Sequence, residues 1–139
     1  MTGIIKVNEL QGRTTANDIT VTVGASATQS LEQGMAKMWA QFESSTNVIE
    51  GSLNASSLTD NGTGDFTIPV TNSFSGDGTF SATYGGNVAS GGSLNYATGY
   101  DWNRLPTASN MQWRMENSNG GAYDNAGYGN HISVHGDLA

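Results

Sequence analysis

The sequence contains no cysteine among its 139 residues. This absence excludes a disulfide framework, a thiol nucleophile and thiolate metal ligands. Charged residues make up only 12% of the chain, the five basic residues are scattered, and the formal net charge is −7. Because proteins neutralise a phosphate backbone with clustered Lys and Arg, we expect no nucleic-acid partner.

Long apolar runs are missing as well. The chain has no apolar run of about 18 residues, the length that would suggest a transmembrane helix, so we expect no membrane insertion. The scattered basic residues also form no polybasic anchor for anionic lipid. A chain of this length fits one ordinary domain, or a short arm followed by a compact module.

Small neutral residues are abundant instead. Glycine supplies 19 positions, and Ser, Thr and Asn fill much of the remainder. The hydrophobic share is 36%, with three Trp, four Phe and five Tyr, which is enough to bury a core. We therefore expect a folded chain whose solubility depends on neutral hydrogen-bonding groups.

Strand-like segments separated by turn residues dominate the sequence. The first two are "IIKVNEL" at residues 4–10 and "ITVTV" at 19–23, and later ones are "GDFTIPVT", "GTFSATY", "MQWRMEN" and "NHISVHG". The pattern predicts a mainly β fold, either a β-sandwich or a small jelly-roll-like barrel, with one short helix and an N-terminal β-arm. We assign residues 1–28 to an attachment arm and residues 29–139 to the β-sandwich body.

The segment "SLEQGMAKMWAQF" fits two periods. Spacings of four, three and four residues, typical of an amphipathic helix, separate Leu31, Met35, Met38 and Phe42. From Ala36 onward, alternation fits a strand equally well, so we expect a short helix that runs into a strand near Trp39. Ser30 and Gln33 could form its capping box. Since such a short seam is unstable alone, we predict that its four apolar side chains contact partner chains.

The stretch "TDNGTGD", residues 59–65, has three possible interpretations. A calcium loop is disfavoured because Gly62 and Gly64 occupy positions where ligands would be needed. A phosphate loop would need a lysine and a following helix, but "FTIPV" has the pattern of a strand. A hairpin in which Asn61-Gly62 supplies positive φ explains the residues without any ligand.

Metal and catalytic candidates are few. His131 and His135 lie in a β-like segment where a spacing of four only places them on one sheet face, and Asp137 alone lies close enough to add a ligand. We expect no metal, no cofactor and no catalytic residue. A carboxylate pair formed by Asp101 with Glu116 or Asp124 keeps a glycan depolymerase as an alternative.

Two glycine-broken segments, residues 85–110 and 117–130, carry a group of aromatic side chains. Its members are Tyr96, Tyr100, Trp102, Tyr123 and Tyr128. Rings surrounded by Asn, Gly and Ser are typical of adaptable binding loops, so we predict a surface that binds a glycan or protein receptor. Alternatively, the rings fill the core or a contact between subunits.

A family resemblance adds to these inferences. The stretch "QSLEQGMAKMWAQF" followed by "SLNASSLTDNGTGDFTIPVTNSF" resembles a module in the distal parts of tail-fibre and other appendage proteins of marine bacteriophages, and "IIKVNELQG" resembles the opening of many such proteins. The resemblance is strongest over residues 29–74. It implies a homotrimeric virion protein, assembled in the cytoplasm of the host bacterium, that joins other virion proteins through its N-terminal arm. A capsid decoration or head-fibre protein that stabilises the shell is the alternative.

Overall fold

The protein consists of two compact units, Met1–Met35 and Ala36–Ala139. This division comes from a computed structural model, which describes residues 6–11, 19–23, 26–86, 95–98, 105–117, 120–124 and 129–139. The boundary between the units thus follows Met35, whereas the sequence predicts an arm that ends at residue 28. Within the described residues, no helix has the length and apolarity needed to span a bilayer.

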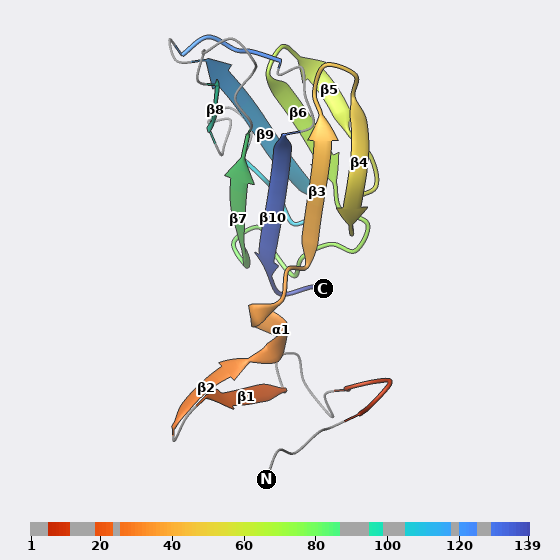
Figure 1. Ribbon diagram of the computed structural model, residues 1–139, viewed down its shortest axis with the longest axis vertical. Helices are drawn as coiled ribbons and strands as arrows, with labels where there is room; N and C mark the ends of the chain where they lie inside the picture. Colours follow the sequence, from red (N-terminus) through yellow and green to blue (C-terminus); the bar gives the residue numbers. More distant parts are fainter. Residues whose placement is uncertain are drawn as a thin grey trace. The chain divides into compact units, whose positions relative to one another are not determined.

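The N-terminal unit contains an antiparallel ribbon of β1 (Thr20–Val23) and β2 (Ala27–Ser30), followed directly by α1 (Leu31–Gly34) (Figure 1). The side chain of Ser30 begins the helix by accepting a hydrogen bond from the backbone N–H of Gln33 at 3.4 Å. The predicted short helix is therefore confirmed. The predicted strand at 4–10 is wrong over its described part, since residues 6–10 form no strand.

The second unit contains two four-stranded sheets, each antiparallel throughout. The first has the order β4 (Val48–Leu53), β3 (Met38–Glu43), β10 (Asn130–Gly136) and β7 (Phe80–Gly85). The second has the order β5 (Thr59–Gly62), β6 (Asp65–Pro69), β9 (Asn110–Asn117) and β8 (Asn95–Thr98).

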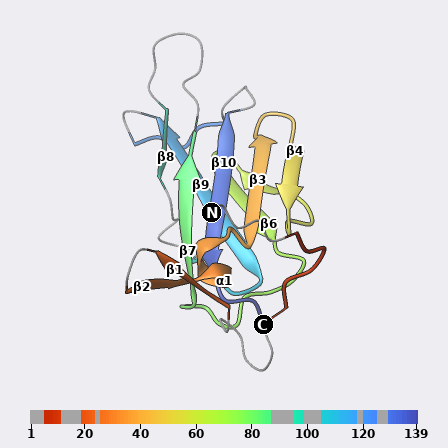
Figure 2. The ribbon, with the colours of Figure 1, turned by 60° about the horizontal axis from the view of Figure 1, so that its bottom comes forward.

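The two sheets lie face to face, with the first in front in Figure 1 and Figure 2. Inward side chains recur at every second residue, as the pleat of a strand requires. The predicted sandwich is thus confirmed, and the described strands do not close into a barrel.

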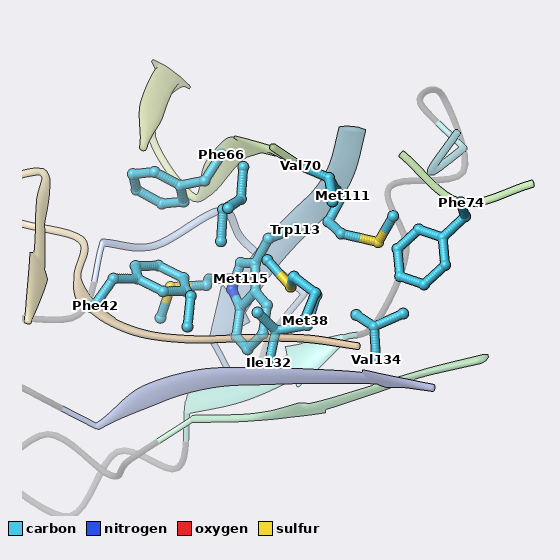
Figure 3. Close-up of a cluster of buried hydrophobic side chains, with 12 residues drawn as sticks. Met38, Phe42, Phe66, Val70, Phe74, Met111, Trp113, Met115, Ile132 and Val134 are labelled. Carbon is cyan, nitrogen blue, oxygen red and sulfur yellow. The ribbon is translucent and has the colours of Figure 1, made fainter. Parts of the chain in front are cut away.

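A hydrophobic core lies between the sheets (Figure 3). The indole of Trp113, fully buried, packs edge-on against Phe42 at a centroid distance of 5.3 Å and against Tyr84 at 4.9 Å. The remaining fully or nearly buried apolar side chains are Met38, Ala40, Phe66, Ile68, Val70, Phe74, Met111, Met115, Ile132 and Val134. This packing supplies the burial that a chain poor in charged residues needs.

Asn54 connects three segments at one end of the sandwich, and replacing it by alanine is expected to lower the free energy of unfolding by about 2 kcal/mol. Its φ of +59° is left-handed. Its Nδ2 donates to the carbonyls of Lys37 and Asn72, each at 3.0 Å, and its Oδ1 accepts from Asn72 N at 2.6 Å. Urea unfolding would measure the loss.

Asn47 provides a matched control for that experiment. Its φ of +57° is nearly the same, but its side chain makes only an exposed bond to Asp60 at 3.2 Å. Alanine at Asn47 should therefore cost about 1 kcal/mol or less. Equal losses at the two positions would show that the side-chain bonds of Asn54 contribute nothing.

Candidate functional site

The stretch at residues 59–65 forms a hairpin corner between β5 and β6. Gly62 and Gly64 have φ of +130° and +72°, so the hairpin prediction is confirmed, although Asn61 itself lies within β5 and has no positive φ. The side chain of Asn61 donates to Thr67 Oγ1 at 2.8 Å, and Asp60 Oδ1 accepts from Gly62 N at 2.8 Å. The polar groups of the corner therefore have structural partners.

The tip of this hairpin is attached to distant parts of the chain. Gly64 donates its N–H to Asp124 Oδ1 at 2.6 Å and accepts a hydrogen bond from Met115 N at 2.7 Å. The N–H of Tyr123 donates to the carbonyl of Met115 at 3.2 Å. The hairpin, the end of β9 and residues 120–124 are thereby held together.

The backbones of two predicted receptor-binding residues each pair with the same end of β9. Tyr96 pairs with Glu116 in the β8–β9 register, and Tyr123 is hydrogen-bonded to the neighbouring Met115. Tyr100, Trp102 and Tyr128 lie outside the described residues. The assignment of receptor binding to these aromatic residues remains a prediction.

The carboxylates considered for glycosidic chemistry have structural partners where they are described. Glu116 Oε1 accepts from Arg114 Nε at 2.8 Å, with both side chains one-quarter exposed. Asp124 accepts from the hairpin as described above, and Asp101 lies outside the described residues. Across the described part of the chain, no three His, Asp or Glu side chains are grouped so that they could hold a metal ion.

The predicted four-residue oligomerisation seam is split between the two units. The helix ends at Gly34, and the strand period of β3 directs Met38 and Phe42 into the sandwich core, where neither is exposed. The seam is therefore wrong for these two residues. Leu31 and Met35, in contrast, line an open hollow of about 220 Å³ in the N-terminal unit.

That hollow has a mainly apolar wall. Its remaining lining residues are Val21, Gln29, Ser30 and Gly34. Val21 and Met35 are 43% and 49% exposed, and no side chain described before Ala36 is buried. The described residues of the N-terminal unit thus leave apolar surface uncovered among themselves.

Sequence reasoning missed a second surface, the outer face of the sheet β4-β3-β10-β7. Trp39 points away from the core and is 41% exposed, because it alternates with the inward Met38 and Ala40. The alternation in "MWAQFE" could have revealed this. On β10, His131 and His135 share the outer face, as predicted from their spacing.

Two candidate surfaces therefore stand out in the described residues, the N-terminal hollow and the outer sheet face. Neither contains a recognised catalytic grouping. Comparisons with protein-family models, with curated proteins and with solved structures find no match to the chain. Any assignment of function therefore depends on the residues of these two surfaces.

Proposed function

We propose that the protein is a non-enzymatic structural component of a bacteriophage particle, a tail-fibre-like appendage that attaches to the host surface. The N-terminal unit joins the chain to its own copies and to other virion proteins. The segments 85–110 and 117–130, with Tyr96, Tyr100, Trp102, Tyr123 and Tyr128, bind the host. Assembly takes place in the cytoplasm of the host bacterium.

The observation that carries this proposal is the absence of a core among the described residues of the N-terminal unit. A two-stranded ribbon is marginal in water without a third strand or a packing partner. Here the ribbon is followed by a single helical turn, and its hollow is lined by the exposed Val21 and Met35 and by the half-buried Leu31. In the proposed assembly, other chains cover the apolar surface that these described residues leave open, as at the attachment end of an assembled particle protein.

The resemblance to phage appendage modules and the low content of charged residues also support a structural protein of the phage particle. A capsid decoration or head-fibre protein would have the same need for a covered N-terminal unit, so the location on the particle distinguishes the two. Electron microscopy of virions labelled with an antibody against the sandwich tests both. A few labels at the tail support the fibre, a dense lattice on the shell supports decoration, and unlabelled virions contradict both.

The assembly is expected to be a homotrimer, with a native mass three times the 14.5 kDa of one chain. Replacing Leu31 and Met35 together by serine should convert the trimer largely to monomer, because both side chains lose the apolar surface that partner chains would bury. Sedimentation equilibrium measures the mass. Circular dichroism of the same samples should show an unchanged β spectrum.

Leu105→Ser is the matched control, since Leu105 is an exposed apolar side chain of the sandwich, outside the hollow. This variant should remain trimeric. A wild-type chain that stays monomeric at high concentration would contradict the assembly, and a trimer that tolerates both serines would exclude the hollow as its contact.

A further inference from the structure

The outer face of the sheet β4-β3-β10-β7 carries an aromatic side chain among uncharged polar ones. Strand pairing aligns Leu53, Trp39, Ser133 and Thr83 in one row across the four strands. The next row contains Gly51, Gln41, His131 and Gly85. From the usual strand spacing, each row spans roughly 14 Å, the length of a short oligosaccharide.

Two glycines allow rings to lie against this face. The Cζ3 and Cη2 atoms of Trp39 lie 3.4 Å from the position that a Cβ of Gly51 would take. A Cβ at Gly85 would overlap the imidazole of His131. The indole therefore lies at van der Waals distance from the Cβ position of Gly51 and remains 41% exposed, whereas any side chain at Gly85 would displace the imidazole.

An exposed indole of this kind is suited to a sugar ring. Its face carries partial negative charge, and the C–H bonds on one side of a pyranose present a flat surface of partial positive charge. Gln41, His131 and Ser133 lie beside it at neighbouring positions of the two rows, where they can exchange hydrogen bonds with hydroxyl groups. Stacking would hold the sugar, and these polar groups would orient it.

The charge of the face indicates which glycans fit. None of its four strands, all of them described, contains Lys or Arg, and the chain carries a net charge of −7. Glu43 is held at the rim by hydroxyl donors from Ser45 at 3.1 Å and Thr46 at 2.9 Å. An acidic polysaccharide would meet repulsion without a compensating cation, so a neutral one is favoured.

The apolar area of the face is too small for a protein partner of ordinary size. Only three exposed apolar side chains lie on it, namely Trp39, Val48 and Leu53, and each is less than half exposed. A stable protein interface buries about 800 Å² on each partner around a hydrophobic centre. One sugar chain requires far less.

We propose that this face binds a neutral hexopyranose chain, with one sugar ring stacked on Trp39 and its hydroxyl groups bonded to Gln41, His131 and Ser133. The inference rests on the proposed attachment function and deepens it. It names the chemistry of the receptor, and it assigns binding to residues other than the aromatic ones predicted from the sequence. It concerns the purified protein alone. Its failure and the failure of the virion assignment are therefore separate results.

Isothermal titration of the full chain with neutral hexaoses of glucose, galactose, mannose and N-acetylglucosamine tests the proposal. At least one should bind, and Trp39→Ala should weaken its Kd at least tenfold, as expected for loss of a central aromatic contact. Trp39→Tyr keeps a planar ring and should retain most of the affinity. Gly51→Thr keeps Trp39 but adds a branched side chain beyond the Cβ position that already contacts the indole. It should displace the ring and weaken binding as much as Trp39→Ala.

Leu105→Ala is the control, because Leu105 is 70% exposed and lies outside this face. It should bind as the wild type does, and thermal unfolding should show that every variant is folded. The proposal is overturned if no neutral hexaose binds, if an acidic hexaose of galacturonate binds more tightly, or if Trp39→Ala leaves Kd unchanged. A fall in native mass of Trp39→Ala without any sugar binding would also overturn it, since the face would then be a contact between copies.

Discussion

Replacement of Gly64 by alanine is expected to lower the free energy of unfolding of the sandwich by about 3–4 kcal/mol. Gly64 has a φ of +72°, and a Cβ there would overlap the carbonyl oxygen of Met115 and approach Tyr123 N to 2.9 Å. The left-handed backbone accounts for about 1 kcal/mol of the loss. The remainder comes from displacing the hydrogen bonds of Gly64 with Met115 and Asp124, each worth about 1 kcal/mol.

Gly120→Ala is the control that separates these two causes. Gly120 has a φ of +76°, almost that of Gly64, but nothing lies within 4 Å of its Cβ position. Its replacement should cost only about 1 kcal/mol. Urea unfolding followed by far-UV circular dichroism gives both values, and equal losses would show that the hairpin tip is not anchored by close contact.

Phe42→Ala should cost about 3–5 kcal/mol, the usual range for removing a phenyl ring from a packed core. The Phe42 ring is fully buried, with its centroid 6.0 Å from that of Phe66 and 5.3 Å from that of Trp113. The residue belongs to β3, so the loss should appear as a lower urea midpoint of the sandwich. At protein concentrations where the variant is folded, its native mass should match that of the wild type.

Met35→Ala serves as the comparison, because Met35 was assigned with Phe42 to one seam but is half exposed in the N-terminal unit. Its replacement should change the unfolding of the sandwich by less than about 0.5 kcal/mol. If Phe42→Ala left the sandwich stable and altered only the native mass, the helical seam would be right and the core assignment wrong.

The ambiguity between helix and strand in residues 31–42 shows what sequence patterns could not decide. The spacings of Leu31, Met35, Met38 and Phe42 fit a helix, while Met38, Ala40 and Phe42 also alternate as a strand. The strand prevails after Gly34 because β3 pairs with both β4 and β10, and β10 lies far away in sequence. Local periodicity carries no information about such pairing.

The other strands of the sandwich could be predicted from the sequence where their local patterns were clear. The strands β6, β7, β9 and β10 coincide closely with four segments bounded by turn residues. By contrast, β8 lies within a glycine-broken stretch that has no alternating pattern, and its order depends on pairing with β9. The outer position of Trp39 followed from its strand, but the contact of the His131 ring with Gly85 joins two strands that are remote in sequence.

The central place of β10 has a consequence for protein synthesis. This strand lies between β3 and β7, so β3 has only β4 beside it and β7 lacks its partner in the sheet until residues 130–136 have left the ribosome. A nascent chain at that stage holds the inward faces of β3 and β7 without the strand that joins them. Because the contacts that complete the sheet are so distant in sequence, the interval before β10 emerges is when the chain is most exposed to aggregation and most dependent on chaperones.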